Sequence, residues 1–428
     1  MTTLDRRTKD AHKCLQTLED GGYVARLAGG CVRDRLMGVP PVDFDVATNA
    51  TPEQTTVLFR GRGYKVVPTG IEHGTVTIVA PSGPIEVTTL RRDVATDGRR
   101  AQVAFGESFE EDAERRDFTI NAMFEDAQGQ IYDYFGGLED LKAARLRFVG
   151  DASTRIREDY LRILRLFRFW SKLGFVPVPG TLDAVMSEKA GLAVISQERI
   201  TSELIKTLSG DFAPGPMAAL HQSGVWPMIL PELAEGAPCL SGHLPSTFWP
   251  LAPEIPANRR GVGVLAAACL WEWRERTLAP WTHLGTRLRL PKSDVKALAW
   301  FPLLLDRLKH LGSERADILL LAEECDHHGG TESFPGFYSP ILEALAKAGH
   351  PEAKAIGDSI RTVLVTEAKW GHLRHNAPPV SGKEAMARLG ISQGPLLGEL
   401  LLKLRRAYLN GDWNEKDDGL RILGNWRS

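Results

Sequence analysis

Strand-forming patterns are confined to roughly the first third of this 428-residue chain, and helical spacing dominates the remainder. Short runs rich in β-branched residues occupy positions 66–67, 75–80 and 85–90, with turn residues between them. Residues 51–54 form a capping box with proline at the first helical position, so we expect a helix from there to about Phe59. A strand-rich segment followed almost only by helices predicts an α+β fold with a mixed sheet in its N-terminal part.

Two breaks divide the helical part of the chain. Prolines recur between residues 231 and 256, and Pro378-Pro379 forms the second interruption. A chain of this length is also too long for one hydrophobic core. We therefore predict four parts, which we name the head (1–148), the neck (149–230), the body (231–376) and the tail (377–428).

Composition argues against several classes of protein. The net charge of −2 makes binding of nucleic acid through an overall positive field improbable, so such binding would need local basic patches. No apolar run is long enough to span a bilayer, and the polar N-terminus does not resemble a signal peptide. The five cysteines lack the spacing of a zinc site. They predict reduced, buried thiols in a cytoplasmic protein.

A glycine pair marks the first candidate ligand site. Gly29-Gly30 ends an apolar run and precedes an amphipathic segment at 32–37. Residues without a Cβ atom let the backbone approach a ligand closely, and the N–H groups at a helix start attract negative charge. Arg33 follows in the first helical turn, where its guanidinium can bind two phosphate oxygens. An isolated glycine pair before a helix is most often only a turn.

Two acidic residues form the second candidate site. Residues 42–46 alternate with period two, which predicts a strand with Asp43 and Asp45 on one face. Carboxylates placed side by side repel each other unless a cation lies between them, and Mg²⁺ prefers such oxygen ligands. Glu86 lies in another predicted strand and is a candidate third catalytic carboxylate, with a solvent-facing position as the alternative.

The two sites occur together as GGCVRDRLMG followed by DFD. In combination they resemble the signature of the DNA polymerase β nucleotidyltransferase superfamily, and most closely the bacterial class II tRNA nucleotidyltransferases and their poly(A) polymerase relatives. The resemblance is specific over about residues 23–210 and loose after them. It implies nucleotide transfer to an RNA 3′ end by a two-metal mechanism, with Mg²⁺ on Asp43 and Asp45. Gly30 and Arg33 are expected to help neutralise the leaving pyrophosphate.

The segment RRDFTINA at 115–122 resembles the family's sugar- and phosphate-binding motif. This resemblance implies that Asp117 accepts a hydrogen bond from a ribose 2′-OH, which would favour ribonucleotides over deoxyribonucleotides. Arg116 is expected to neutralise the triphosphate, and Asn121 is interpreted as holding the turn instead of contacting the substrate. For an isolated RRD, a surface cluster of ion pairs would be the alternative.

Residues 157–169 have helical spacing and carry a stripe of charged side chains, Asp159, Arg162, Arg165 and Arg168. Such a stripe is usually a solvated face, but EDYLRILRLFRF matches the family's base-recognition helix. Cytosine and adenine each present an amino donor beside a ring-nitrogen acceptor, which a carboxylate next to a guanidinium complements. Uracil and guanine have the opposite polarity and would leave buried polar groups unmatched. Asp159 and Arg162, one helical turn apart, are therefore expected to select CTP and ATP, and Arg165 and Arg168 are further candidates for nucleotide binding.

Four other segments have counterparts in the family. Residues 91–106 are polar and interrupted by an Asp-Gly pair, which predicts a mobile surface loop, and they resemble the family's loop for switching from C to A addition. Residues 132–141 resemble a hinge motif with structural glycines. Residues 196–208 resemble a segment that braces the base-recognition helix through ion pairs. Basic residues at 403–406, in the tail, are expected to contact the elbow of tRNA.

The resemblance implies a template-independent tRNA nucleotidyltransferase that adds or repairs the 3′-terminal CCA. Its expected partners are tRNA, at the 3′ end and the elbow, with ATP and CTP, and neither a membrane nor DNA. Enzymes that add only A or only CC, and poly(A) polymerases, share the head motifs and remain alternatives. The full-length segment at 91–106 argues against CC addition alone. A catalytically inactive RNA-binding protein is a remote alternative, because Asp43, Asp45 and the RRD segment are intact.

Overall fold

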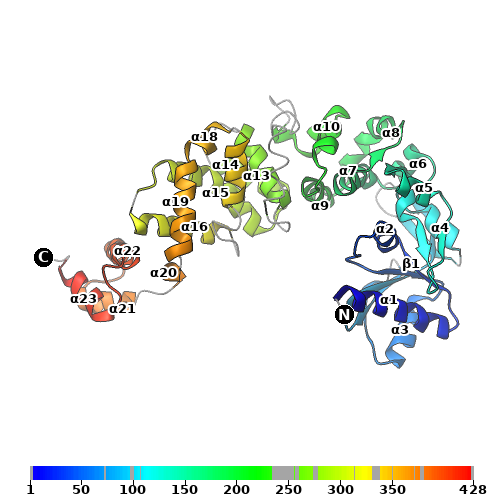
Figure 1. The fold of residues 1–428 in the computed structure, drawn as a ribbon, viewed down its shortest axis with the longest axis horizontal. Helices are drawn as coiled ribbons and strands as arrows, with labels where there is room; N and C mark the ends of the chain where they lie inside the picture. Colours follow the sequence, from blue (N-terminus) through cyan, green and yellow to red (C-terminus); the bar gives the residue numbers. More distant parts are fainter. Residues whose placement is uncertain are drawn as a thin grey trace. The chain divides into compact units, whose positions relative to one another are not determined.

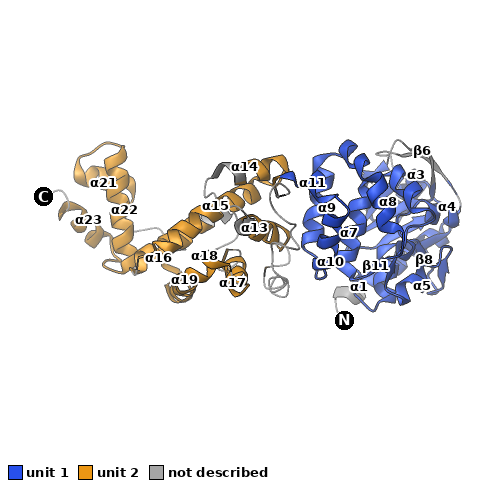
Figure 2. Ribbon diagram, turned by 90° about the horizontal axis from the view of Figure 1, so that it is seen from above, with its two compact units in different colours: residues 1–231 blue, residues 232–428 orange. Residues whose placement is uncertain are grey.

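The structure is a computed structural model in which two compact units, Met1–Pro231 and Glu232–Ser428, are coloured separately in Figure 2. Unit 1 contains every residue predicted for the site, and each unit is described here by itself. The division into head, neck, body and tail stays a prediction. None of the described helices is long and apolar enough to cross a membrane. The residues that the structure describes are 3–71, 74–96, 101–106, 108–233, 255, 260–272, 278–312, 314–329, 338–348, 350–370, 372–375 and 380–425.

A seven-stranded mixed sheet is the framework of unit 1 (Figure 1). Its strands lie in the order β3-β4-β5-β2-β1-β8-β9. β2 and β5 pair in parallel, whereas the other neighbours pair antiparallel. A mixed sheet of this kind, followed by helices, confirms the predicted α+β class. The strands are β1 (Ala25–Ala28), β2 (Asp45–Thr48), β3 (Lys65–Gly70), β4 (Thr75–Ala80), β5 (Gly83–Thr89), β8 (Met123–Glu125) and β9 (Ile131–Asp133).

Two helices, α1 (Thr3–Asp20) and α3 (Pro52–Gly61), cover one face of this sheet (Figure 1). α3 begins at the predicted capping box, in which the Thr51 hydroxyl accepts a hydrogen bond from the Gln54 N–H. Burying the apolar layer on this face leaves the opposite face of the sheet for polar groups. The layer includes Leu15, Leu18, Phe44, Val46, Phe59, Val76, Ile78 and Val87.

The opposite face carries the short helix α4 (Phe109–Glu114), whose Phe109 and Ala113 share an apolar cluster with Ala28 of β1. The short helix α2 (Gly30–Leu36) contributes Cys31 and Val32 to the layer under α1 and α3. The pleat of β2 separates the two environments, because successive side chains of a strand point to opposite faces. Val46 packs in the layer under α1 and α3, whereas Asp45 lines a cavity on the other side. The small side chain of Ala47 lines the same cavity and joins a second apolar cluster with residues of α4.

The described residues on either side of 97–100 form paired strands instead of the predicted irregular loop. β6 (Arg91–Thr96) and β7 (Ala101–Phe105) pair antiparallel, and the Gly106 N–H donates to the Leu90 carbonyl at 2.8 Å where this strand pair meets the sheet. The segment is polar, shows little periodicity and is interrupted by an Asp-Gly pair, so the two extended runs that pair were not evident from the sequence. Residues 97–100, which contain that pair, lie outside the described part of the chain.

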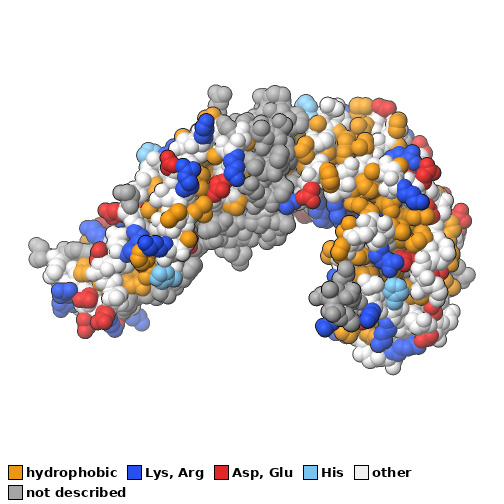
Figure 3. Space-filling model, in the orientation of Figure 1, with side chains coloured by type: hydrophobic (Ala, Val, Ile, Leu, Met, Phe, Trp, Pro, Cys, Tyr) orange, Lys and Arg blue, Asp and Glu red, His pale blue; other side chains and the backbone are white. Residues whose placement is uncertain are grey.

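The remainder of unit 1 is mainly helical. Figure 3 shows hydrophobic side chains gathered over the part of unit 1 where Figure 1 draws these helices. Three of the exposed ones are Val176, Val194 and Phe212, with 56 %, 52 % and 53 % of their surface accessible. The α-helices are α5 (Gly137–Lys142), α6 (Ala152–Glu158), α7 (Leu161–Leu173), α8 (Thr181–Glu188), α9 (Gln197–Leu208), α10 (Pro214–Gln222) and α11 (Trp226–Ile229).

The described residues of unit 2 are helical, as the sequence predicts for them. One helix, α14 (Leu278–Arg287), was not predicted. The last three helices of the unit share an apolar cluster with Ala316 and Leu319 of α16. The other helices are α13 (Arg260–Glu272), α15 (Lys292–Lys309), α16 (Arg315–Gly329), α17 (Ser339–Lys347), α18 (Pro351–Ala355), α19 (Gly357–Trp370), α20 (His372–His375), α21 (Gly382–Leu389), α22 (Pro395–Asn410) and α23 (Lys416–Asn425).

Two of the basic residues predicted to contact tRNA lie in ion pairs within unit 2. Arg405 pairs with Glu323 at 3.3 Å, and Arg406 pairs with Asp317. Lys403 is exposed. A tRNA phosphate that binds Arg405 or Arg406 of α22 would therefore have to compete with the carboxylates of α16.

Four of the five cysteines are buried and are not part of a disulfide, in agreement with the prediction of reduced thiols. They are Cys14, Cys31, Cys269 and Cys325. Cys239 lies outside the described residues.

The glycine pair of the predicted hinge has a structural explanation. Gly136 has φ +77°, a left-handed conformation that costs little only for glycine. An added Cβ atom on Gly137 would lie 2.3 Å from the carbonyl oxygen of Thr119. Thr119 begins the short 3₁₀ helix η2 (Thr119–Asn121), so the close approach holds α5 against that turn. These glycines therefore serve packing, as the sequence predicts.

Replacing Gly137 with alanine should lower the free energy of unfolding by about 1–3 kcal/mol, because backbone atoms must move to admit the Cβ atom. The measurement is urea unfolding of the purified protein. Gly61→Ala is the matched control, since its Cβ atom would meet no heavy atom within 4 Å. A Gly137→Ala variant as stable as the control would contradict the packing role.

Candidate active site

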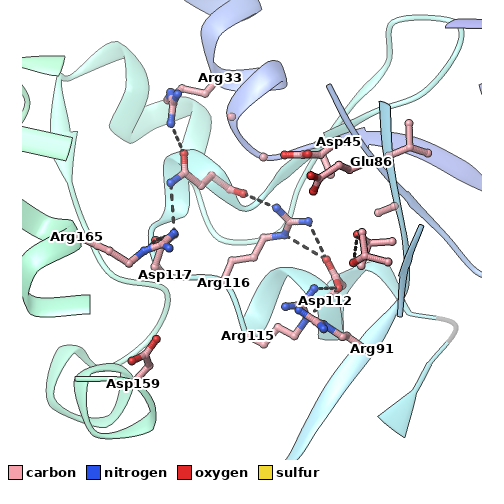
Figure 4. A pocket seen from close by; sticks show the side chains of 18 of the residues that line it. Arg33, Asp45, Glu86, Arg91, Asp112, Arg115, Arg116, Asp117, Asp159 and Arg165 are labelled. Atoms are coloured by element: carbon pink, nitrogen blue, oxygen red, sulfur yellow. Dashed lines mark hydrogen bonds and ion pairs between the residues drawn. The ribbon is translucent and has the colours of Figure 1, made fainter. Parts of the chain in front are cut away.

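A cavity of about 670 Å³ brings most of the predicted site residues together, on the face of the sheet opposite α1 and α3. Strands β2 and β5, helices α2 and α4, the turn η2 and the start of α7 all contribute to its wall (Figure 4). Asp43 and Arg168 are not among its lining residues. Ten of the predicted residues do line it: Gly29, Gly30, Arg33, Asp45, Glu86, Arg116, Asp117, Asp159, Arg162 and Arg165.

Two carboxylates form one end of the cavity. Asp45 and Glu86 are register partners in the parallel pair of β2 and β5, so their side chains emerge from the same face (Figure 4). Burial, and after it the neighbouring Glu86 carboxylate, raise the pKa of Asp45 to about 6 against the opposing effect of Arg116. The prediction that Glu86 faces the same side as the acidic pair is therefore correct for Asp45.

Asp43 lies outside the strand in which it was predicted. β2 begins only at Asp45, and Val42 is 68 % exposed instead of buried on the apolar face. Two prolines precede Val42 and cannot donate to a strand ladder, and the Val42 carbonyl accepts a hydrogen bond from Arg7 of α1. Asp43 is exposed in the bend before β2. Its charge nevertheless contributes to the raised pKa of Asp45.

The chemistry of these carboxylates fits a divalent cation. Asp45 is half-buried, and burial and the Glu86 carboxylate raise its pKa more than Arg116 lowers it, so a bound cation would stabilise the ionised pair. The described residues contain no preformed group of three or more candidate metal ligands. This does not conflict with Mg²⁺, which commonly takes one or two carboxylates and completes its shell with water and substrate phosphate oxygens.

Gly29 is required by a protein side chain at the cavity wall. It has φ +71°, and an added Cβ atom would lie 2.7 Å from Nη1 of Arg116. The same Nη1 donates to the Asn121 carbonyl at 3.2 Å. The glycine pair was predicted to let the backbone approach a ligand. In the structure, the missing side chain of Gly29 makes room for the guanidinium of Arg116.

Asp112 fixes the two arginines of the RRD segment. It is 1 % exposed, and its two carboxylate oxygens pair separately with Arg115 and Arg116 (Figure 4). Burial alone would raise the pKa of Asp112, but the two guanidiniums hold it below its usual range. The sequence analysis missed Asp112 and Arg115, both of which line the cavity. Their signal was the i, i+3, i+4 spacing of Asp112 with the arginines on a helix.

Arg33 has protein partners in place of the predicted phosphate oxygens. Only 4 % of its side chain is exposed. Its Nε and Nη2 donate to one oxygen of Asp34, and its Nη1 donates to Oδ1 of Asn121 at 2.6 Å. A phosphate contact would use the N–H groups of this guanidinium that remain, so the role of Arg33 at phosphate stays a prediction.

Asp117 is held as an ionised carboxylate. It is 7 % exposed, and its pKa falls to about 2 because Arg165 and hydrogen bonds from Phe118 and Asn121 outweigh the effect of burial. Oδ1 accepts from the Phe118 N–H at 2.9 Å and from the Asn121 amide at 3.3 Å. Oδ2 accepts from Nε and Nη2 of Arg165 at 2.7 and 2.5 Å. These bonds use the acceptor capacity of a carboxylate, so a ribose hydroxyl would have to replace one donor.

Asp159 and Arg162 are not the helical pair that the spacing predicted. Asp159 is extended, with φ −151° and ψ 104°, between the end of α6 and the start of α7. Its Oδ1 accepts from the Leu161 N–H, and such local side-chain bonds compete with helix formation. Its Oδ2 pairs with Arg199 at 2.9 Å. Arg162 is bound by Glu158 and by backbone carbonyls instead of by Asp159.

Arg168 is not among the residues that line the cavity, and its role as a nucleotide ligand stays a prediction. It pairs with Glu203 of α9 at 3.1 Å, and its guanidinium lies 4.4 Å from the ring centre of Phe169. Together with the Arg199–Asp159 pair, this ion pair confirms that the segment at 196–208 braces α7 through charges.

Two family models match parts of the chain. Residues 25–147 match the poly(A) polymerase head domain. Residues 174–236 match a model described as the probable RNA- and SrmB-binding site of polymerase A.

Similar proteins cover most of the chain. CCA tRNA nucleotidyltransferase 1, mitochondrial, of Danio rerio is 49% identical over 93% of this chain and 86% of its own length. The CCA-adding enzyme of Geobacillus stearothermophilus is 33% identical over 96% of this chain and 95% of its own. The crystal structure of the Bacillus stearothermophilus CCA-adding enzyme in complex with CTP has a TM-score of 0.75 at 30% identity, with 98% of both chains covered.

Asp45→Asn should stabilise the metal-free protein at alkaline pH. A carboxyl group whose pKa is higher in the folded state gives most stability below its unfolded pKa and loses it as the pH rises through about 6. Because asparagine carries no charge, the variant should exceed the wild type by about 2 kcal/mol near about pH 8, with the gap closing toward about pH 4. Urea unfolding in the presence of a chelator measures this difference. Equal free energies of unfolding of variant and wild type at about pH 8 would show that the ionised Asp45 carboxylate does not destabilise the fold.

Proposed function

The chain belongs to the family of CCA-adding tRNA nucleotidyltransferases and poly(A) polymerases, and on that premise we propose that it adds or repairs the 3′-terminal CCA of tRNA from CTP and ATP. The observation that carries the proposal is the cavity itself. It places a carboxylate pair, a set of anchored guanidiniums and a candidate base-reading acid around one space. The relatives that are similar over almost the whole chain have names that describe CCA addition or tRNA nucleotidyl transfer.

Asp43 and Asp45 are the proposed ligands for Mg²⁺, with Glu86 beside them as a third carboxylate. When bound, the two metal ions of the proposed mechanism would lower the pKa of the attacking 3′-OH and neutralise the leaving pyrophosphate. The raised pKa of Asp45 supports this assignment because it reflects an unneutralised acid. Asp43 would have to turn toward the cavity from its exposed bend to share the ion.

Arg116 is the proposed partner of the triphosphate, with Gly30 and Arg33 nearby. Its guanidinium is held in place by Asp112, so little side-chain entropy remains to be lost when a phosphate binds. Asp117 is the proposed acceptor for the ribose 2′-OH. Since its lone pairs are occupied, the hydroxyl would replace one of its present donors.

Asp159 and Arg162 are the proposed base-reading pair, and both line the cavity. Arg162 donates to the carbonyl of Arg115 at 2.9 Å, which links the base-reading side to the phosphate-binding RRD segment. To face a base edge, Asp159 would exchange its ion pair with Arg199 for the exocyclic amino group of cytosine or adenine. A carbonyl in that position would repel the carboxylate, which is how uracil and guanine would be rejected.

Narrower activities are the alternatives. Enzymes that add only A or only CC, and poly(A) polymerases, would use the same head. The segment at 91–106, which resembles the loop that serves the change from C to A, is full length, and this argues against an enzyme that adds only CC. A cytoplasmic location and contact with the tRNA elbow stay predictions.

Incorporation of labelled CTP and ATP into tRNAs that lack CCA, CA or A tests this function, with an unrelated RNA as control. We expect addition to all three tRNAs and not to the unrelated RNA. Asp43→Ala and Asp45→Ala should each lower incorporation by roughly 10³-fold or more, since a metal ion supplies several kcal/mol of charge stabilisation. Their tRNA affinity should stay near the wild-type value. Activity within about tenfold of wild type in either variant would refute the metal role.

Asp159→Ala should relax base selection. Loss of the carboxylate removes the repulsion against a carbonyl, so incorporation of UTP and GTP relative to CTP and ATP should rise about tenfold or more. Single-nucleotide incorporation with all four NTPs measures the change. Arg199→Ala is the matched control, because it breaks the same ion pair but keeps the carboxylate. Unaltered selectivity with a lowered melting temperature would mean that Asp159 is only a structural partner of Arg199.

A further inference from the structure

We infer that Asn121 is a positioning residue that orients the carboxylate of Asp117 for the ribose and thereby sets the preference for ribonucleotides without contacting the sugar. The inference rests on the proposed role of Asp117 as the 2′-OH acceptor. It goes beyond the interpretation of Asn121 as a residue that only holds a turn.

The side chain of Asn121 joins two predicted ligand residues. It lies at the end of η2, is 7 % exposed and lines the cavity. Its Oδ1 accepts from Nη1 of Arg33 at 2.6 Å, and its Nδ2 donates to Oδ1 of Asp117 at 3.3 Å. These two bonds link Arg33 to Asp117 through the amide, and Asp117 is also bound by Arg165, which lies beside it in Figure 4. A continuous polar chain therefore runs from α2 through η2 to α7.

The chemistry of the chain requires an amide at this position. A guanidinium can only donate hydrogen bonds, and the ionised Asp117 can only accept them. The group between them must accept at one end and donate at the other. Asparagine does both without a charge, and the two partners fix which end is which. An aspartate would keep the bond to Arg33 but place a second carboxylate beside Asp117.

The Asn121 amide and Arg165 bind different oxygens of the Asp117 carboxylate. Arg165 binds Oδ2 of Asp117 through two nitrogen atoms, whereas Oδ1 is held by the Phe118 N–H and the Asn121 amide. Without the amide, one hydrogen bond on the Oδ1 side is lost and the carboxylate is free to turn toward Arg165. The acceptor that faces the cavity would then move.

The phosphate side of the cavity depends on a different atom of the same residue. Arg116 is bound by the backbone carbonyl of Asn121, and that carbonyl survives replacement of the side chain. Asp112 still holds Arg116 from the other direction. Side-chain variants of Asn121 should therefore change sugar selection more than triphosphate binding.

The test compares equilibrium affinities for CTP and dCTP, and their incorporation into tRNA, in Asn121→Ala and Asn121→Asp. We expect the ribose-to-deoxyribose preference to fall about tenfold in Asn121→Asp and less in Asn121→Ala. Asn121→Asp keeps the bond to Arg33 and should bind inorganic triphosphate as the wild type does. Thr119→Val is the matched control. It lies in the same turn and loses a buried hydrogen bond, to Asp140 at 2.7 Å, on the side away from the cavity. It should lower the melting temperature and leave the preference unchanged.

A double variant shows whether Asn121 acts through Asp117. If it does, Asp117→Ala lowers the preference, and adding Asn121→Ala to it has no further effect. The inference is overturned if Asn121 variants keep the wild-type preference, if the double variant loses more than Asp117→Ala alone, or if Thr119→Val has the same effect. An unchanged preference in Asp117→Ala would refute both the sugar role of Asp117 and this inference. Addition of CMP and AMP to tRNA by the wild type would still stand, so the two failures are distinguishable.

Discussion

The parallel register of β2 and β5 brings the carboxylates of Asp45 and Glu86 together, and the other features of the cavity can be understood as responses to that placement. Two neighbouring acids on a partly buried sheet face cost stability in the absence of a cation, which is why the pKa of Asp45 rises to about 6. The opposite face of the same strands carries Val46 and Val87 in an apolar layer under two helices. A packed layer on one side thus holds a polar, unneutralised pair in place on the other.

Guanidiniums surround this acidic end, and the protein orients each of them with its own groups. Asp112 holds Arg115 and Arg116, and Asp117 holds Arg165. Each pairing keeps a cation on the cavity wall in a defined position before any phosphate arrives, so less ordering is needed on binding. The low pKa of Asp117 shows that this carboxylate is firmly ionised. The cavity wall therefore carries ion pairs, and a bound nucleotide would replace some of the carboxylates that now pair with the arginines. The net charge of the whole chain is only −2.

Several expectations failed where local pattern competed with contacts from elsewhere. The alternation at 42–46 predicted a strand, but Arg7 takes the Val42 carbonyl and the strand starts later. The spacing of Asp159 and Arg162 predicted one continuous helix. The helix is interrupted at Asp159, whose side chain accepts a hydrogen bond from the Leu161 N–H. Arg168 follows the same stripe as Arg165, yet it pairs with Glu203 and does not line the cavity. Each failure involves a partner that is distant in the sequence or a side chain that replaces a backbone bond.

The sequence by itself determined the α+β class, the apolar face of the sheet, the capping box of α3 and the residues of the glycine, RRD and charged-helix motifs, because these follow from periodicity and from residue chemistry over short spans. Only the tertiary structure decided which donors and acceptors meet. It brought Glu86 beside Asp45, set Arg116 against Gly29, and made Asn121 the link between Arg33 and Asp117. The physical reason is that such pairings depend on strand order and on helix placement. Both are fixed by burial of apolar surface over the whole of unit 1, not by any one segment.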